Sequence, residues 1–228
     1  MTKHERWSRR RLLGFGLAVP LGAMVVPVRA LASTCGLTPR QTSGPFFPLW
    51  DQLDKDVDLT KLLGHDAAAK GTVLRVEGRV LDEDCRPVRN ALVDLWQADT
   101  NGRYSHPADP NPARRDPNFQ GWGQAITDRD GRYAFRTIKP AAYPREFLDG
   151  RPDENAGWRT PHIHFRVTKP GYRELSTQMY FAGEALNDTD RVLAQVPREA
   201  WPRVVIAGID GTAGQPPTYP FDLTIARA

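Results

Sequence analysis

Two histidines stand close together at a spacing that suits a metal site. His162 and His164 lie in the run from Trp158 to Phe165, where a proline favours an extended entry. In a β-strand, alternate side chains point to the same face, so the two imidazoles point together while Ile163 and Phe165 point into a core. Such a pair can also be only the polar face of a strand. The chain has five histidines, and the placing of two of them here favours metal binding.

Four other residues are candidates to complete a metal site with these histidines. Tyr104 follows the turn Asn101-Gly102, and Tyr143 precedes a proline that holds it extended. Both tyrosines are expected on loops between strands, where functional side chains are usually displayed. His106 and Asp128 are the remaining candidates. Each of the four also fits a plainer role, as a half-buried aromatic with a satisfied hydroxyl or as an ordinary turn residue.

From Thr72 onward the sequence alternates between short strand-like runs and turns. The tight-turn dipeptide Asp130-Gly131, for example, leads into a run of alternating apolar and polar residues. Strands of this length and spacing, without long helical periodicity, predict an all-β domain over residues 73–228 with low helical content. We expect an antiparallel β-sandwich of the immunoglobulin or transthyretin type. The expected strands are Val73–Val80, Ala91–Trp96, Arg132–Ile138, His162–Val167, Thr177–Phe181, Arg203–Ile209 and Phe221–Ile225.

Residues 33–72 are expected to form an N-terminal arm rather than a domain. The segment from Thr42 to Pro48 is rich in turn residues and holds two aromatic side chains. It can lie against the sandwich or line the mouth of a pocket. The run from Asp51 to Lys70 is polar and of mixed charge, with a short helix expected near Thr60 to Gly64.

Residues 1–32 have the pattern of an export signal. Consecutive arginines at Arg9, Arg10 and Arg11 precede an apolar run from Leu12 to Val28, and Ala30-Leu31-Ala32 is a small-x-small cleavage site. The pattern resembles the bacterial twin-arginine signal, which implies a periplasmic or secreted protein. An uncleaved membrane anchor is disfavoured, because glycines and prolines interrupt a run that is short for a bilayer span. We therefore expect no stable membrane association after cleavage.

The formal net charge of +4 comes from this first segment. Residues 1–32 hold six of the 31 Lys and Arg residues but one of the 27 Asp and Glu residues, so the rest of the chain holds 25 basic and 26 acidic residues. Nucleic-acid binding depends on a basic surface. We therefore expect no nucleic-acid partner.

Export also bears on the two cysteines. Cys35 lies just past the expected cleavage site, and Cys85 lies in a turn between strand-like runs. Because the periplasm permits disulfides, we expect a Cys35–Cys85 bridge, with two unpaired thiols as the alternative.

Several stretches, in order along the chain, resemble the intradiol ring-cleavage dioxygenases. The resemblance runs from about Thr38 to Phe181 and is greatest to the protocatechuate 3,4-dioxygenase group, especially its iron-binding β subunit. The arm from Thr38 to Phe46 is similar to the start of the other subunit of that enzyme. The matching stretches are Leu92–Ala98 with Gly102–Tyr104, Asp128–Pro140 with Tyr143-Pro144, Arg159–Phe165, and Gln178–Phe181.

The resemblance implies a ferric ion, Fe(III), bound by Tyr104, Tyr143, His162 and His164. Ferric iron is a hard cation suited to phenolate oxygens and imidazole nitrogens. The implied substrates are O2 and a catechol, whose ring is cleaved between the two hydroxyl-bearing carbons to give a cis,cis-muconate. Tyr143 matches the axial tyrosinate that the catecholate displaces in the family.

The resemblance also implies roles around the iron. Arg159 matches an arginine that stabilises negative charge on the ring, although a plain surface salt bridge is the alternative, and Gln178 matches a polar hydrogen-bonding residue. Substrate contacts are expected from Gly44, Pro45 and Arg145. Since Arg145 stands where the family often has an apolar side chain, catechol, hydroxyquinol, protocatechuate and other substituted catechols all stay open as substrates.

Two further expectations concern class and assembly. The alternative to an enzyme is an exported, metal-free binding module, because transthyretin-like and adhesin sandwiches share the strand-turn pattern. Such a module has no reason to carry two tyrosines and two histidines together at these places. The related enzyme pairs an iron-bearing subunit with a metal-free one, whereas this chain holds features of both, so we expect a homo-oligomer.

Overall fold

The computed structural model describes residues 35–52, 54–212 and 214–228. All of these belong to one compact unit, which spans residues 32–228. The predicted export signal at residues 1–32 lies outside the described residues. Among the residues that are described, no helix is both long and apolar enough to cross a membrane.

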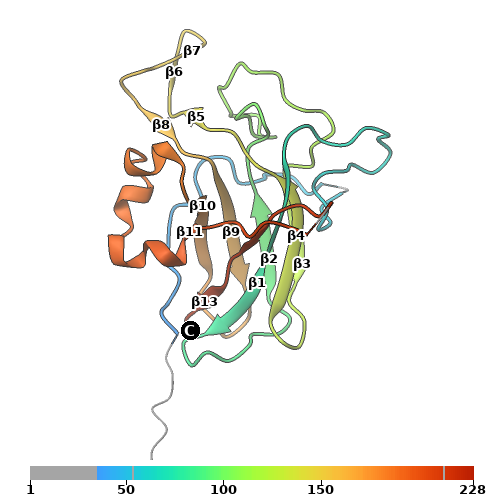
Figure 1. The fold of residues 1–228 in the computed structure, drawn as a ribbon, viewed down its shortest axis with the longest axis vertical. Coiled ribbons are helices and arrows are strands. Elements are labelled where there is room, and N and C mark those ends of the chain that lie inside the picture. The colour runs from blue at the N-terminus through green and yellow to red at the C-terminus, as the bar shows by residue number, and fades with distance from the viewer. Residues whose placement is uncertain (1–34, 53, 213) are drawn as a thin grey trace, which may run out of the picture. The chain divides into compact units, whose positions relative to one another are not determined.

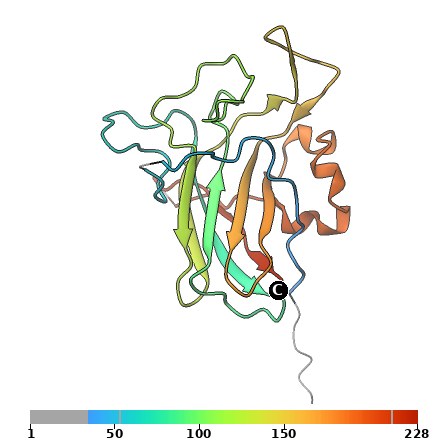
Figure 2. The ribbon, with the colours of Figure 1, turned by 180° about the vertical axis from the view of Figure 1, so that it is seen from behind.

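Two sheets pack face to face (Figures 1 and 2). The first has the strand order β12-β1-β13, and β4 also pairs with β1. The second has the order β11-β10-β9-β2-β3. Bounds in the first sheet are β1 Val73–Asp82, β4 Arg132–Ile138, β12 Thr218–Pro220 and β13 Leu223–Ile225; in the second they are β2 Leu92–Trp96, β3 Trp122–Ile126, β9 His162–Thr168, β10 Leu175–Phe181 and β11 Val205–Ile206.

The long strand pairs are antiparallel, as predicted for this sandwich. β1 pairs with β4, and the chain β3-β2-β9-β10 is antiparallel throughout. The short strands β11, β12 and β13 pair in parallel with their neighbours, which the sequence did not indicate. The all-β sandwich is therefore confirmed, with three short parallel additions at its edges.

Two predicted segments were wrong, and several strands were missed, among them β3 and β12. Residues 203–209 hold only the two-residue β11, because η3 (Arg198–Arg203), a 3-10 helix, occupies the preceding stretch. The helix expected near Thr60 to Gly64 is a turn, closed by the His65 N–H and the Leu62 carbonyl. β3 was missed because its first two residues, Trp122 and Gly123, are both buried and break the alternation.

The core lies between the sheets, where alternate residues of the facing strands meet. Phe135 of β4 and Phe165 of β9 are almost fully buried and pack edge to face across the interior. All seven residues of β10 are buried, because its second face is also covered. Tyr180 on that face packs against the 3-10 segments that follow β10 (Figure 1). They are η1 Ala185–Asp188, η2 Leu193–Gln195 and η3.

The arm runs along the sandwich and is attached at several points. The Thr38 N–H donates to the Thr224 carbonyl, and the Gln41 N–H donates to the Ser176 carbonyl. At the start of the arm, Cys35 and Cys85 form a disulfide with an S–S distance of 2.11 Å. These contacts hold the start of the arm on the sandwich, and further along the arm Phe46 and Phe47 reach Tyr104 and Trp96.

That end carries the short strands and the long loops (top of Figure 1). β5 (Tyr143–Pro144) pairs with β8 (Trp158–Arg159), and between them β6 (Phe147–Leu148) and β7 (Arg151–Pro152) form a projecting hairpin. The loop after β2 lies at the same end. Side chains distant in sequence are therefore gathered around the first residues of β9.

Candidate metal centre

The side chains of two tyrosines and two histidines converge at the start of β9. The Tyr104 hydroxyl oxygen lies 3.2 Å from His162 Nε2 and 3.1 Å from His164 Nε2. The Tyr143 hydroxyl oxygen lies 3.3 Å from His162 Nε2 and 3.4 Å from the Tyr104 hydroxyl oxygen. The four residues proposed from the sequence as metal ligands thus meet with their donor atoms toward one point.

Backbone geometry explains why these side chains meet. Both histidines are buried on one face of β9, as alternation requires. Tyr143 sits opposite Arg159 in the β5–β8 pair. Tyr104 follows Gly102, whose φ of +72° suits glycine, and a Cβ there would stand 2.9 Å from the Ala142 carbonyl oxygen and 3.0 Å from Tyr143 Cβ. The glycine lets the two tyrosine-bearing loops approach closely.

Hydrogen bonds surround the His162 side of the cluster, which we call the polar flank (Arg159, Thr160, Gln178 and Asp190). His162 Nδ1 lies 2.6 Å from the Thr160 carbonyl oxygen. Because that carbonyl can only accept, the imidazole N–H is on Nδ1 and Nε2 is left unprotonated. The Thr160 N–H donates to Asp190 Oδ2 at 2.9 Å, so a buried carboxylate fixes the backbone that orients His162.

Arg159 occupies the same flank and is almost fully buried. Its Nε donates to Asp190 Oδ2 at 2.9 Å, and its Nη2 donates to Gln178 Oε1 at 2.6 Å. Gln178 in turn donates from Nε2 to the Thr42 carbonyl of the arm at 2.9 Å. The alternative of a surface salt bridge for Arg159 is wrong, since its partner Asp190 is fully buried.

Aromatic rings surround the His164 side, which we call the aromatic flank (Phe46, Phe47 and Trp96). The His164 ring stacks on Trp96 with centroids 4.8 Å apart and planes inclined by 13°. Phe47 packs edge-on against Trp96, and Phe46 lies 4.9 Å from the Tyr104 ring. In contrast to His162, His164 Nδ1 is buried with no hydrogen-bond partner among the described residues.

Burial dominates the protonation of the cluster in the absence of a cation. Burial lowers the pKa of His162 and of His164 well below the usual value, and the Arg159 charge lowers both further, so both imidazoles are neutral. Burial raises the pKa of Tyr104 well above its usual value and raises that of Tyr143. Burial alone would lower the pKa of Arg159, but the neighbouring Tyr143 and Asp190 raise it, so the guanidinium stays charged. Neutral imidazoles beside buried phenols are suited to a cation that displaces the phenol protons.

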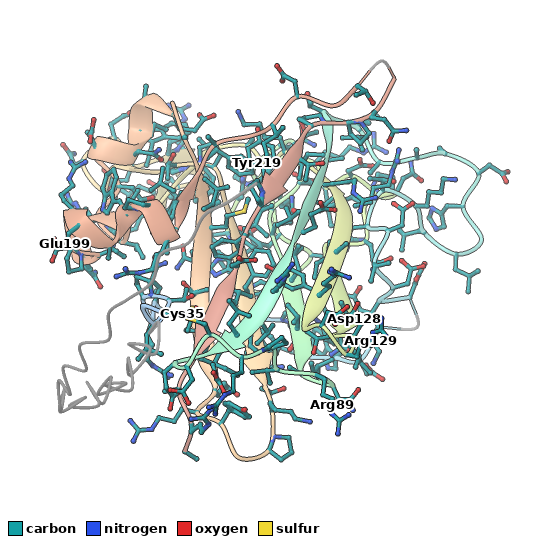
Figure 3. All side chains as sticks on the ribbon, turned by 60° about the horizontal axis from the view of Figure 1, so that its bottom comes forward. Cys35, Arg89, Asp128, Arg129, Glu199 and Tyr219 are labelled. Atoms are coloured by element: carbon teal, nitrogen blue, oxygen red, sulfur yellow. A yellow bond between two sulfur atoms is a disulfide. The ribbon has the colours of Figure 1, made fainter. Side chains whose placement is uncertain are left out.

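The remaining sequence candidates lie in different places. Asp128 is a turn residue whose carboxylate accepts the backbone N–H groups of Asp130 and Arg132, at the end of β4 (Figure 3). His106 does not join the cluster either, because its Nδ1 accepts the Ala108 N–H. Neither residue belongs to the set of converging donors.

The residues expected to contact substrate lie on the arm and beside Tyr143. Gly44 has a φ of +69°, and a Cβ built on it would lie 3.4 Å from His164 Cε1. Pro45 follows it and is exposed. Arg145 is half-buried, and among the described residues its guanidinium makes no ion pair or hydrogen bond. The outward pair with Glu146 or Asp149, considered as an alternative for such an arginine, is not formed.

Sequence reasoning missed three residues that hold the site. Asp190 lies in a 3-10 region 31 residues from Arg159. Gln41 anchors the arm by donating from Nε2 to the Gln178 carbonyl at 3.0 Å and accepting from the Tyr180 hydroxyl at 2.7 Å. Trp96 was noticed only as part of a strand. A buried carboxylate or a stacked indole carries no local signal, so only the fold reveals these roles.

The donor set fits a first-row transition metal ion. Donor atoms about 2.0–2.2 Å from a common cation stand roughly 3 Å from one another, and the four donor–donor distances given above are 3.1–3.4 Å. In the described part of the chain no group of three His, Cys, Asp or Glu residues could hold a metal. The two phenols are therefore essential to this set, and oxygen-rich donors of this kind suit a hard cation such as ferric iron.

Comparison with known sequences identifies related proteins. The dioxygenase family model matches residues 43–216. The chain is 40% identical over 189 residues to the protocatechuate 3,4-dioxygenase beta chain of Burkholderia cepacia, covering 82% of this chain and 78% of that one. It is 32% identical to catechol 1,2-dioxygenase 2 of Acinetobacter lwoffii, covering 75% of this chain and 61% of the relative.

Solved structures share the fold. The 3-chlorocatechol 1,2-dioxygenase of Rhodococcus opacus 1CP superposes with a TM-score of 0.64 at 25% identity, covering 83% of this chain and 72% of that chain. The dioxygenase domain of a dioxygenase–carbohydrate-binding protein fusion from Streptomyces sp. SirexAA-E has a TM-score of 0.57 at 29% identity, covering 85% of this chain and 100% of that chain. These matches decide against the metal-free binding module. The chain belongs to the intradiol ring-cleavage dioxygenases.

Proposed function

We propose that this chain binds one ferric ion through Tyr104, Tyr143, His162 and His164 and uses it to cleave a catechol between its two hydroxyl-bearing carbons. Intradiol dioxygenases use non-haem iron. The single observation that carries the proposal is the convergence of four donor atoms at separations of 3.1–3.4 Å. When bound, the ferric ion would make the ring of a chelated catecholate reactive toward O2.

Tyr143 is the residue best placed to move a proton. Its ring is half-buried, whereas Tyr104 is almost fully buried. Burial raises the pKa of Tyr143, and the nearby Arg159 charge opposes that effect. We assign the Tyr143 hydroxyl oxygen the role of accepting a proton from the incoming catechol, because a partly accessible phenolate can be reached by substrate.

Arg159 supplies a fixed positive charge beside the reacting ring. Its guanidinium is held on two sides, by Asp190 and by Gln178, so it needs no rearrangement when negative charge develops. Gln178 is itself tied to the arm through the Thr42 carbonyl. Arg159 thus stabilises charge, and Gln178 positions Arg159 while the arm closes that side of the site.

The proposed substrate is protocatechuate or another substituted catechol, with its ring substituent near Gly44, Pro45 and Arg145. The guanidinium of Arg145, which has no partner among the residues that the structure describes, supports an anionic substituent such as a carboxylate. A charge-assisted contact is worth about 1.5–3 kcal/mol, roughly ten- to a hundredfold in affinity. Arg145→Leu should lower kcat/KM for protocatechuate by about that factor while leaving catechol turnover nearly unchanged. An unchanged protocatechuate-to-catechol ratio of kcat/KM would remove Arg145 from substrate recognition.

Ring cleavage itself is tested by oxygen consumption. The purified, iron-supplied protein should consume one O2 per catechol or protocatechuate and form the corresponding cis,cis-muconate, identified by its absorbance and mass. Cleavage beside, rather than between, the two hydroxyl-bearing carbons would give a coloured semialdehyde and would contradict the proposal. The binding-module alternative predicts no O2 consumption.

We further propose an exported, periplasmic or secreted homo-oligomer. The signal-like pattern at residues 1–32 and the Cys35–Cys85 disulfide support export. The arm and the four donors lie in one chain, which supports activity without a second gene product. Activity that appears only after adding another subunit would overturn this assembly.

A further inference from the structure

A cleft of about 550 Å³ opens between the arm and the loops that lie between β2 and β3. Arm residues 48–50 form one wall, and others come from residues 103–107 and from Arg115, Pro117, Phe119 and Gln120. Tyr104 borders this cleft, but the other three proposed iron ligands and Arg159 do not. The cleft is therefore separate from the space enclosed by the four donor atoms.

The charged residues that line this cleft are all positive. Arg103 and Arg115 line it, and among the described lining residues there is no Asp or Glu. Arg103 acts on the nearby buried Asp109, where it opposes the rise in pKa that burial causes. Arg115 has no ion-pair partner among the described residues and donates from Nη1 to the Ser105 hydroxyl at 2.5 Å. An exposed guanidinium fixed at one N–H, with no ion-pair partner among the described residues, is suited to an anion.

The opposite wall is apolar and unusually exposed. Leu49 is 63% exposed and Trp50 is 66% exposed, and both line the cleft. An indole presented at the edge of a cleft offers a broad flat surface for another ring. The two walls together suit a ligand that has an aromatic body and an anionic end.

Two buried polar groups in the lining lack partners. His106 is 9% exposed, and because its Nδ1 accepts the Ala108 N–H, its Nε2 carries a proton. That N–H has no acceptor among the described residues. Gln120 is 2% exposed and donates from its amide NH2 to two backbone carbonyls, while its Oε1 has no partner within the described ranges. Buried polar groups usually have a hydrogen-bond partner in the protein, a water molecule or a ligand. These two groups therefore indicate that a water molecule or a polar ligand atom binds in or beside the cleft.

We propose that this cleft binds a small aromatic carboxylate, with its ring against Trp50 and its carboxylate on Arg115. The volume lies within the range of about 300–1,000 Å³ usual for small-molecule sites. This binding needs neither the iron nor the catechol hydroxyls, and Tyr104 is the one proposed iron ligand that also lines the cleft. The ligand class follows from the charge, the exposed indole and the size of the cleft.

The test uses two probes of the same shape, 2-naphthoate and the uncharged 2-naphthamide. Titration of the full chain, followed by calorimetry under anaerobic conditions, should show saturable binding of one naphthoate and about tenfold weaker binding of naphthamide. Arg115→Gln should reduce naphthoate affinity to that of the amide. Trp50→Ala should weaken both probes by a similar factor.

Matched controls come from neighbouring residues. Arg114 is exposed like Arg115 but does not line the cleft, and Leu63 is 82% exposed and also lies outside its lining. Arg114→Gln and Leu63→Ala should bind both probes as the wild type does. Excess catechol should not displace naphthoate.

Three results would overturn the proposal. The first is equal affinity for both probes, or an Arg115→Gln variant indistinguishable from Arg114→Gln. The second is displacement of naphthoate by catechol, which would place the probe at the iron centre. The third is a lack of saturable binding together with a dimer that Trp50→Ala dissociates in light scattering, which would assign this face to a second copy of the chain.

Discussion

The two histidines on β9 stand two residues apart, yet different kinds of contact hold them. On the polar flank, His162 is oriented by a hydrogen bond to the Thr160 carbonyl, behind which lies the buried Asp190. On the aromatic flank, His164 Nδ1 has no hydrogen-bond partner in the described part of the chain, and the ring is oriented by stacking on Trp96. One side of the site is fixed by directional, charged contacts and the other by close packing of rings.

This difference bears on the chemistry. The polar flank places Arg159 where negative charge develops and keeps it charged through Asp190. The aromatic flank excludes water from His164 and closes the site with the arm. A site for O2 and a catechol needs both properties, because a fixed charge acts more strongly where water is excluded.

The largest expected effect comes from breaking the polar flank at its centre. Asp190→Ala would leave Arg159 buried without its counter-charge, and removing one partner of a buried pair costs about 3–5 kcal/mol. Urea unfolding should show a loss of that size. Asp188→Ala, which breaks an exposed pair with Arg198 close by, should cost about 0–1 kcal/mol. Similar losses in the two variants would show that Asp190 is no more than a surface carboxylate.

The aromatic flank should respond to shape rather than to charge. Trp96→Ala removes a fully buried ring, at a cost of about 3–5 kcal/mol, whereas Trp96→Phe keeps a ring beside His164 and should cost less. Iron affinity should fall about 10- to 100-fold in the alanine variant, as for loss of other groups that orient metal ligands, and less in the phenylalanine variant. Equal iron affinity in wild type and Trp96→Ala would show that the Trp96 indole does not orient His164 for metal binding.

The pH dependence is a further test. It concerns both flanks alike, because burial keeps both imidazoles neutral. Burial lowers their pKa in the folded chain, while in the unfolded chain they take up protons below about pH 6.5. The free energy of unfolding of the iron-free protein should therefore be highest above that pH and should decrease as the pH falls below it. The loss should approach about 1.4 kcal/mol per pH unit for each histidine. Urea unfolding at pH 8, 7, 6 and 5 measures it, and constant stability over this range would contradict the burial of neutral imidazoles.

The same two flanks show what the sequence can and cannot predict. The shared face of His162 and His164 follows from strand alternation, which is a local property, and so it was predictable. The stack of Trp96 on His164 depends on the register between β2 and β9, in which these two residues are paired. Asp190 reaches Arg159 only because the chain turns back through 3-10 segments after β10. Contacts of this kind depend on tertiary packing, and no local pattern of residues indicates them.

The same reasoning explains the errors in the fold. Trp122 and Gly123 break the alternation of β3 because both faces of that strand are covered there, with Gly123 close to the Asp56 carbonyl and Leu59 of the arm. Residues 203–209 are apolar enough for a strand, but the 3-10 helix η3 holds Arg203. In both cases a neighbouring segment overrides the local pattern.

The iron content and visible spectrum of the purified chain test the central claim most directly. We expect one iron per chain and a visible absorption band from tyrosinate-to-ferric charge transfer. Both should be lost in Tyr104→Phe and His162→Ala, and both should be kept in Tyr172→Phe, whose ring lies on the sandwich away from the site. A colourless wild-type protein that takes up no iron, or full iron content in Tyr104→Phe and His162→Ala, would contradict the assignment of these four residues as the metal centre.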